Sequence, residues 1–409
     1  TCRRAEAAEP VPEVPVMAVR EDNHFPEDLL QCAPRDRLAY FKAYTVRHTR
    51  LERAFTELIQ AISEPANAAY ILLVGPTGVG KTTLRLGIER HLIAAVSAAL
   101  DGHAGRLPVC STTAVGPDSG TFNWKDYYRR ALQALQEPLI GDKVAIGEHE
   151  APQRGGARLA VASSAESPVL RRALEHALQY RRPQAFIVDE AQHFLKVASG
   201  RRLQDQMDSI KSLADYGETV HVLLGTYDLL ALQTLNGQVI RRGITLHFPR
   251  YRAERPEDVV AFQRVLVSFE QQLPVRVKPD LLALWPYCFE RSLGCVGVLK
   301  DWLTRALATA LAEDATTVTP AHLRRHALAA AGCERMLSEA LHGEEQLAEQ
   351  EEAVVRLRFR LGLPAPEDSA PHSQRDTRTE PKTAGAGTRR PGERLPKRDP
   401  IRVEGRHGQ

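Results

Sequence analysis

Several features that would assign this chain to a familiar class are missing from its sequence. Its 409 residues include only six cysteines, which show no C-x-x-C spacing and no paired histidines nearby. A zinc site or a disulfide framework is therefore not expected, and buried thiols in a reducing compartment are the better interpretation. No apolar stretch approaches the roughly 18 residues of a membrane-spanning helix, and no signal peptide is visible. These absences predict a cytoplasmic protein without membrane contact.

The chain also lacks a strong overall charge. The net charge is only +3, so bulk charge does not indicate a nucleic-acid partner. The whole excess lies in residues 362–409, which hold ten Lys or Arg against seven Asp or Glu, together with seven prolines. This tail has almost no large apolar side chains to bury, so it is predicted to be a basic, proline-rich and disordered extension. Residues 1–33 are predicted to be a second, largely disordered extension.

A complete phosphate-binding loop is the most informative feature that is present. Residues 75–82 follow the pattern G-x-x-x-x-G-K-S/T directly after the apolar run at 70–74, which predicts a buried strand, a turn and a helix. Backbone N–H groups of such a loop bind anionic phosphate together with the helix N-terminus. Lys81 is expected to reach the outer phosphates of ATP, and the Thr82 hydroxyl to ligate Mg²⁺. The predicted nucleotide-binding residues are Gly75, Pro76, Thr77, Gly78, Val79, Gly80, Lys81, Thr82 and Thr83.

A second catalytic signal is the acidic pair Asp189 and Glu190. The pair follows the apolar run at 185–188, which is typical of a strand covered on both faces in a parallel sheet. The acids are then expected at the carboxyl end of this strand, beside the phosphate-binding loop, where open α/β sheets bind ligands. Asp189 is predicted to hold Mg²⁺ through its water shell, and Glu190 to orient and deprotonate the attacking water. ATP hydrolysis is the expected reaction.

Strand and helix patterns alternate through the first two thirds of the chain. Apolar runs predict strands at 70–74, 106–111, 185–188, 220–224 and 244–248. Helical spacing is found between these runs and also before them, at 34–62. This alternation is typical of a doubly wound parallel sheet, so the predicted fold class is α/β. The predicted domains are an α/β nucleotide-binding domain at 34–255, with an insertion at 137–165, a helical lid at 256–332 and one amphipathic helix at 333–361.

A sheet followed by a helical lid resembles the plan of AAA+ ATPases, and three further residues fit this resemblance. Thr226 follows the strand at 220–224 and is expected to sense the γ-phosphate or the attacking water. Arg241 and Arg242 precede the last strand, where AAA+ ATPases commonly present an arginine finger to the nucleotide of a neighbouring subunit. A guanidinium stabilises the charge that develops during phosphoryl transfer, so hydrolysis would depend on assembly. Either arginine is a candidate, and a plain surface role is the alternative.

A set of collinear segments between about residue 36 and residue 347 carries a more specific resemblance. They are DRLAYF at 36–41, YTVRH at 44–48, GPTGVGKTT at 75–83, VDEAQH at 188–193, GQVIRR at 237–242, HFPRY at 247–251 and GCVGVLK at 294–300. Together they resemble the TniB/TnsC group, AAA+ regulators of bacterial DNA transposition. The resemblance implies a bacterial ATPase that assembles on DNA in its ATP form, as a ring or a filament. Its implied partners are DNA of any sequence, further copies of itself, a transposase and a target-selecting protein.

The same resemblance places the segment 121–130 on the DNA-facing side of an oligomer. Lys125, Arg129 and Arg130 are the candidate DNA contacts, because they would neutralise phosphates without reading the base sequence. The alternative is that the aromatic residues of this segment belong to the core and its arginines to a solvated helix face. The chain departs from the wider AAA+ pattern at the second sensor, where Gly297 replaces an arginine and Lys300 follows one turn later. Slow hydrolysis is the expected consequence.

Two other functions stay open from the sequence. A replication-type AAA+ initiator or helicase loader would share the nucleotide site, but would normally add a DNA-reading domain after the lid. A signalling NTPase would switch a partner without contacting DNA. The tail at 362–409 is expected either to engage the transposase or to add nonspecific DNA affinity.

Overall fold

The computed structural model describes residues 25–97, 105–117, 120–142, 167–196, 200–235, 237–348 and 351–364. The chain divides into two units, with the boundary between Ala348 and Glu349. The terminal extensions predicted at 1–33 and 362–409, and the insertion predicted at 137–165, lie largely outside the described residues. Within the first of these ranges, a short 3-10 helix, η1 (Glu27–Gln31), is present.

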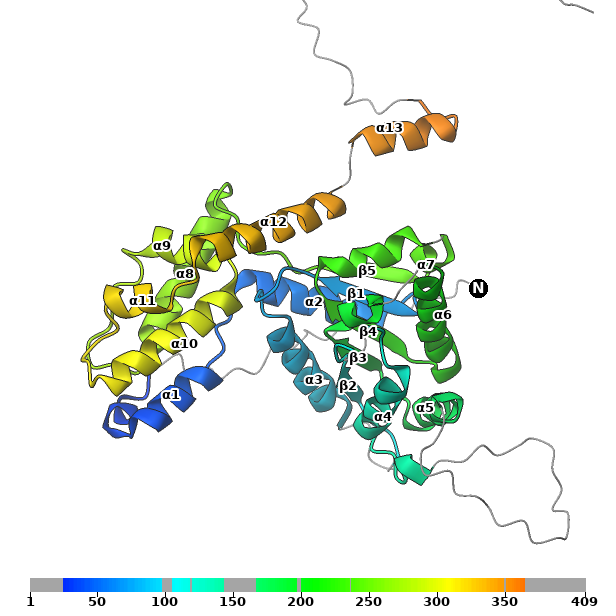
Figure 1. The fold of residues 1–409 in the computed structure, drawn as a ribbon, viewed down its shortest axis with the longest axis horizontal. Coiled ribbons are helices and arrows are strands. Elements are labelled where there is room, and N and C mark those ends of the chain that lie inside the picture. Colours follow the sequence, from blue (N-terminus) through cyan, green and yellow to red (C-terminus); the bar gives the residue numbers. More distant parts are fainter. Residues whose placement is uncertain are drawn as a thin grey trace, which may run out of the picture. The chain divides into compact units, whose positions relative to one another are not determined.

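Five parallel strands of the described chain form one sheet in the order β2-β3-β4-β1-β5 (Figure 1). They are β1 (Tyr70–Val74), β2 (Val109–Thr113), β3 (Ala185–Asp189), β4 (Val220–Gly225) and β5 (Gly243–His247). Every neighbouring pair is parallel, which confirms the predicted doubly wound sheet. Because β1 lies between β4 and β5, the loop that follows β1 emerges within the sheet rather than at its rim.

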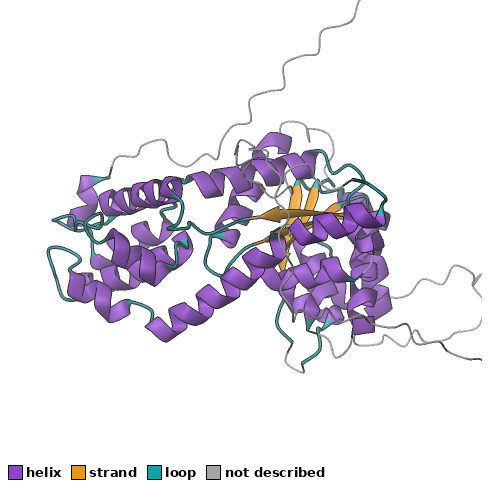
Figure 2. Ribbon diagram, turned by 90° about the horizontal axis from the view of Figure 1, so that it is seen from above, coloured by secondary structure: helices purple, strands orange, loops and turns teal. Residues whose placement is uncertain are grey.

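Helices cover both faces of this sheet (Figure 2). One layer contains α4 (Trp124–Ala134), α5 (Ser167–Arg181) and α6 (Gly200–Gly217), and the other contains α2 (Thr49–Ser63) and α3 (Lys81–Ser97). Leu72 and Val74 pack in the first layer, whereas Ile71 and Leu73 pack in the second, because side chains alternate along a strand. The apolar run at 70–74 is continuous in the sequence because both faces of β1 are buried.

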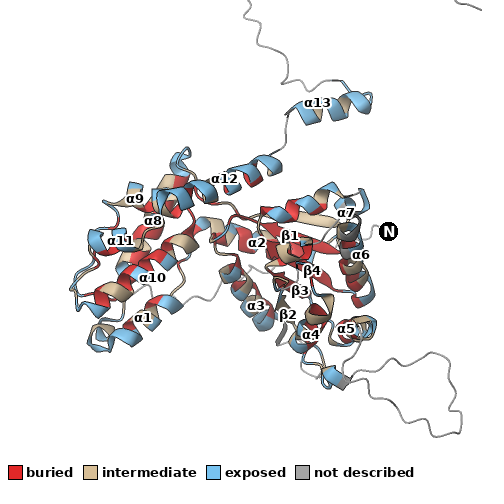
Figure 3. Cartoon of the chain, in the orientation of Figure 1, coloured by how far each residue is buried: buried red, intermediate tan, exposed pale blue. Residues whose placement is uncertain are grey.

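A second group of helices forms the lid (Figure 3). It contains α8 (Pro256–Gln272), α9 (Trp285–Ser292), α10 (Val296–Ala312) and α11 (Pro320–His326). The helical region predicted at 34–62 consists of two helices, and the first, α1 (Pro34–Ala43), packs in the lid core. Phe41 of α1 is fully buried there, in edge contact with Phe269. The lid core therefore includes a segment that precedes the sheet in the chain.

The prediction of a single helix at 333–361 is wrong. The structure has α12 (Ala330–Leu347) and α13 (Glu351–Arg360), and the backbone at Ala348 between them is extended. The expected stripe of leucines does not form one buried face, because Leu341 is 49% exposed whereas Gly343 and Glu344 are buried. α12 belongs to the larger unit and α13 to the second unit. The break falls where the contacts that bury α12 end.

Shorter elements complete the described chain. They are the helix α7 (Gly237–Arg241) and the 3-10 helices η2 (Ile140–Asp142), η3 (Ala191–Leu195) and η4 (Tyr227–Thr234). Asn123 caps α4 by accepting a hydrogen bond from the Asp126 N–H at 3.1 Å, and asparagine is a preferred residue at this position. Among the described residues, no helix has the length and apolar character needed to cross a membrane.

Two buried histidines link the stability of this fold to pH. Burial lowers the pKa of both His48 and His221 to about 4, and the charge of Arg50 lowers that of His48 further in the same direction. His48 precedes α2, where its Nδ1 accepts a hydrogen bond from the Leu51 N–H at 3.4 Å. His221 is 1% exposed in β4. Both imidazoles are therefore neutral in the folded protein above about pH 4.

We expect the free energy of unfolding to fall as the pH is lowered from 6.5 to about 4. In this window the unfolded chain binds protons at both histidines and the folded chain does not, so stability falls by up to about 1.4 kcal/mol per pH unit and histidine. Above that window neither state binds these protons and the contribution is constant. Urea denaturation across the window measures the slope. His221→Phe, beside Phe186, should show a shallower slope than the wild type; equal slopes would contradict the assignment.

Candidate nucleotide-binding site

The phosphate-binding loop between β1 and α3 adopts a conformation that its glycines permit. Gly78 and Gly80 have φ values of 75° and 116°, in the region that side chains other than hydrogen disfavour. At Gly75 a Cβ would overlap the carbonyl oxygen of Phe248, so the loop passes the end of β5 in direct backbone contact. Helix α3 begins at Lys81, at the end of this loop. A glycine-rich turn that runs into a helix N-terminus is an arrangement that binds phosphate.

The ammonium group of Lys81 lies inside the loop. Its Nζ donates to the carbonyl oxygens of Gly75 at 2.9 Å and Pro76 at 3.0 Å, and the residue is only 8% exposed. Burial lowers the pKa of Lys81, and the negative charges of Glu190 and Asp189 oppose this effect. The cation is thus held at the place where the loop would receive phosphate.

Thr82 and Asp189 meet next to the loop, although they are far apart in the sequence. Thr82 Oγ1 donates to Asp189 Oδ2 at 3.1 Å, and Asp189 is 4% exposed. A hydroxyl and a carboxylate fit Mg²⁺, which prefers oxygen ligands and usually keeps several waters. The described residues contain no cluster of three or more His, Cys, Asp or Glu side chains able to hold a metal ion. A cation here would therefore complete its ligands with phosphate oxygens and water.

Arg85 is a neighbour of Asp189 that sequence reasoning missed. Its Nε donates to Asp189 Oδ2 at 3.3 Å, and its Nη1 donates to Ser111 Oγ at 3.1 Å. Glu89 on the next turn of α3 is a further ion-pair partner. Arg85 thus compensates the buried charge of Asp189, which would otherwise be costly. Its position one turn after Lys81 in α3 could have indicated that Arg85 lies near the phosphate-binding loop.

A chain of hydrogen bonds joins Glu190 to Thr226 through the amide of Gln192. Glu190 has a left-handed backbone with φ 55°, and its N–H donates to Asp189 Oδ1 at 3.0 Å. Gln192 Nε2 donates to Glu190 Oε2, and Gln192 Oε1 accepts the N–H of Thr226 at 3.4 Å. The Thr226 hydroxyl itself donates to Asp228 Oδ2 at 3.1 Å. Gln192, to which the sequence interpretation gave no role, therefore connects the predicted base to the predicted sensor.

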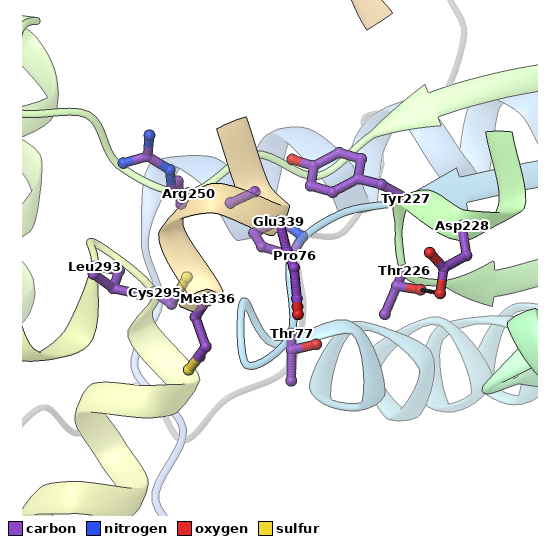
Figure 4. Close-up of a pocket in the computed structure, with 11 residues that line it drawn as sticks. Pro76, Thr77, Thr226, Tyr227, Asp228, Arg250, Leu293, Cys295, Met336 and Glu339 are labelled. Carbon is purple, nitrogen blue, oxygen red and sulfur yellow. Dashed lines mark hydrogen bonds between the residues drawn. The ribbon is translucent and has the colours of Figure 1, made fainter. Parts of the chain in front are cut away.

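Two pockets meet at the phosphate-binding loop. The larger pocket, of about 430 Å³, is lined by 77–83, Glu190, Gln192 and Thr226, and by Val296, Gly297 and Lys300 from the lid. Most of the predicted phosphate-binding residues, the predicted base Glu190 and the predicted sensor Thr226 thus share one pocket with the first turn of α10. The smaller pocket, of about 270 Å³, lies beside Pro76, Thr77 and Thr226 (Figure 4). Its remaining wall includes Met336, Glu339 and Ala340 of α12.

A buried ion network attaches α12 near the sensor residue. Glu344 is 6% exposed, and its carboxylate lies 3.1 Å from Arg250 Nε and 2.7 Å from Arg252 Nη2. Tyr227, which directly follows Thr226, packs on Gly343 so closely that a Cβ there would overlap the ring. Removing one partner of a buried ion pair costs about 3–5 kcal/mol because the other charge stays buried. The helix that precedes the second unit is therefore firmly fixed beside the nucleotide site.

The two candidate finger arginines differ in their surroundings. Arg242 pairs with Asp215 through both of its terminal nitrogens, and this hydrogen-bonded contact raises the pKa of Arg242. Arg241 is exposed at the end of α7, and no hydrogen bond or ion pair joins it to the part of the chain that the structure describes. Neither arginine lines the larger pocket of its own chain. Arg241 is thus the guanidinium that is available to another molecule.

The candidate DNA residues lie on α4, whose apolar side belongs to the core. The buried aromatic side chains of this segment are Phe122, Tyr127 and Tyr128, and they cluster with Phe194. The aromatic residues are therefore structural, as the alternative interpretation held. Lys125 and Arg129 are half-buried. Arg130 is exposed and forms an ion pair with Asp126 at 2.7 Å.

Comparison with known proteins identifies the class of this site. Residues 65–233 match the family model described as an AAA domain, a range that contains the phosphate-binding loop, Asp189, Glu190 and Thr226. With its parallel five-stranded sheet, the chain has the fold of an AAA+ P-loop NTPase. Over residues 65–233 the chain is thus similar to AAA domains, whose fold it shares.

Solved structures with some likeness to the chain have low sequence identity to it. The Aeropyrum pernix ORC2 protein in its ADP form is 16% identical, with a TM-score of 0.46 over 80% of this chain and 79% of that one. The Walker-type ATPase PABY2304 of Pyrococcus abyssi is 13% identical, with a TM-score of 0.41 over 76% of each chain. Drosophila ORC bound to DNA is 14% identical, with a TM-score of 0.40 over 88% of this chain and 79% of that one. No curated protein matches the sequence.

We expect Glu190→Gln to bind ATP but to slow hydrolysis by about 10²–10⁴-fold, the usual effect of losing a general base. Gln192→Ala removes the amide that holds this carboxylate and should slow hydrolysis by a smaller factor, whereas Lys81→Ala should abolish tight ATP binding. Phosphate release at saturating ATP, measured together with ATP affinity, separates these effects. Gln204→Ala on the exposed face of α6 is the matched control. A wild-type rate in Glu190→Gln would show that the base is wrongly assigned.

Proposed function

We propose that this chain is an ATPase switch that oligomerises on DNA in its ATP form and regulates target-site selection and transposase recruitment in DNA transposition. The observation that carries the proposal is a nucleotide pocket in one chain together with Arg241, an exposed arginine outside that pocket that has no ion-pair partner in the described chain. A pocket of this kind performs phosphoryl transfer best when a neighbour supplies the missing cation. The collinear resemblance to the TniB/TnsC group supplies the biological setting.

Each residue of the pocket has a distinct role in the proposed reaction. Lys81 and the backbone of the loop bind the phosphates, and Thr82 and Asp189 would hold Mg²⁺. Mg²⁺ bound there would neutralise charge on the phosphate oxygens. Glu190 accepts a proton from the attacking water, and Gln192 fixes the orientation of its carboxylate. Thr226, which lines the same pocket, would respond to the γ-phosphate.

Arg241 is proposed as the finger that completes a neighbour's site. We expect Arg241→Ala to keep normal ATP affinity and to lose the stimulation of hydrolysis by protein concentration and DNA, by roughly 10³-fold or more if the finger is fully engaged. Arg242→Ala is the matched control, because the Arg242 guanidinium is already paired with Asp215. Phosphate release per subunit measures both.

A mixing experiment tests whether the finger acts between subunits. Combining Arg241→Ala with Lys81→Ala protein should restore part of the activity, because each variant keeps the half-site that the other lacks. Hydrolysis per wild-type subunit that does not change with concentration would contradict the proposal.

DNA binding tests the proposed function most directly. Binding should require ATP or an analogue, accept any sequence and weaken steeply with salt, because phosphates are contacted. Replacing Lys125, Arg129 and Arg130 by alanine should reduce the slope of log affinity against log salt by about 0.9 for each phosphate that is no longer neutralised. The control replaces three exposed lid arginines, Arg264, Arg305 and Arg324. An unchanged slope in the α4 variant would exclude this segment as the DNA-binding surface.

The remaining outcomes separate the alternative functions. Absence of DNA binding at low salt would favour a signalling NTPase. If DNA binding is present, the ATP-bound complex can be sedimented with a purified transposase or with a replicative helicase. Recruitment of the transposase supports the proposal, and recruitment of the helicase alone would favour a replication-type initiator or loader.

A further inference from the structure

The lid touches the phosphate-binding loop through a backbone hydrogen bond at the start of α10. The N–H of Val298, in the first turn of α10, donates to the carbonyl oxygen of Gly78 at 3.1 Å. A Cβ at Gly297 would overlap that same oxygen, and a Cβ at Gly78 would overlap Cγ2 of Val298. The overlap with a main-chain oxygen makes glycine necessary at position 297 for this contact, and the positive φ favours glycine at position 78.

This contact orients one peptide group of the loop. The carbonyl of Gly78 points toward α10, and a trans peptide places its N–H, that of Val79, on the opposite side. The Val79 N–H is only weakly engaged, by the carbonyl oxygen of Pro76 at 3.4 Å. Holding the carbonyl outward therefore keeps a backbone donor facing the inside of the loop, where an anion would accept a hydrogen bond from it.

Lys300, on the next turn of α10, does not hydrogen-bond to the phosphate-binding loop. Lys300 Nζ donates to the carbonyl oxygens of Lys42, at 3.1 Å, and of Tyr44. Lys42 is in the last turn of α1 and Tyr44 directly follows this helix, so Lys300 links α10 to the end of α1. In the described chain, the lid thus meets the loop through Gly297 and Val298, and its nearby lysine is already engaged.

The first turn of α10 is also rigidly coupled to the rest of the lid. Val296 and Leu299, on either side of the contact, are buried in the lid core with Trp302 and Leu303 of the same helix. Because packed cores resist local deformation, displacing this turn from the loop would move the lid as a body.

We propose that Gly297 is a positioning residue whose missing side chain lets α10 dock on Gly78, and that this backbone docking controls how fast the pocket releases nucleotide. The inference rests on the proposed nucleotide site, because the docked turn lines the same pocket as Lys81 and Thr82. With the lid docked, the loop is held in its binding conformation and the pocket is closed on one side. Release of bound nucleotide then requires the lid to leave the loop.

Gly297→Ala tests this directly, with Gly332→Ala as the matched control. Both are glycine-to-alanine changes in helices, but a Cβ at Gly332 would meet no atom within 4 Å. Gly297→Ala should speed dissociation of a fluorescent ADP analogue by about tenfold, the effect of losing one well-formed hydrogen bond in the docked state. Hydrogen exchange should show loss of protection at the Val298 amide, while Trp302 and Leu303 stay protected. Gly332→Ala should match the wild type in both measurements.

A second variant removes the hydrogen-bond donor itself. Val298→Pro lacks the N–H that binds Gly78, and proline is tolerated in the first turn of a helix. It should also speed ADP release, so the proposal stays testable if Gly297→Ala does not fold. Release within about twofold of the wild-type rate in the folded variants, or an unprotected Val298 amide in the wild type, would overturn the proposal. A wild-type protein that binds no nucleotide would instead overturn the proposed ATPase function itself.

Discussion

Close backbone packing around the phosphate-binding loop is the constraint on which the rest of the site depends. At Gly75 a side chain would overlap the carbonyl oxygen of Phe248, next to the end of β5, and at Gly297, in the first turn of α10, it would overlap the carbonyl oxygen of Gly78. Contacts between main-chain atoms cannot be relieved by a change of rotamer. The strand ends, the loop and the lid are therefore held in one arrangement, and the pocket of about 430 Å³ is formed between them.

The buried carboxylates Asp189 and Glu344 are each compensated by ion-pair partners, whereas in the described chain the exposed Arg241 is not. Asp189 is paired with Arg85 and accepts from Thr82, and Glu344 is paired with two arginines. A buried ion without a partner would be costly, so these groups form fixed parts of the site. Arg241 has no such partner in the described chain and lies on the surface. The arrangement thus separates charges that are fixed by partners around the pocket from an exposed charge on the surface.

Much of the fold follows from local sequence patterns. The sequence does not predict where the helical regions are interrupted, because that depends on distant packing partners. The apolar runs at 70–74, 185–188 and 220–224 are the strands β1, β3 and β4, because strands buried on both faces need continuous apolar residues. The helical regions predicted at 34–62 and 333–361 are each interrupted. In the first region, α1 packs in the lid core and α2 packs on the sheet. In the second region, α12 ends where its packing against the rest of the larger unit ends. Helical periodicity does not record what each half packs against.

The sequence by itself determined the phosphate-binding loop, the acidic pair at the end of β3 and the alternating order of strands and helices. These features are contiguous in the chain, and their conformations depend on glycine, on strand burial and on helix starts, all of which are local. Only the tertiary structure decided that, in the described part of the chain, Arg242 is paired while Arg241 is not, that Gln192 joins Glu190 to Thr226, and that Gly297 docks on Gly78. Each of these outcomes depends on partners distant in the chain, and the pattern around one partner contains no information about the position of the other.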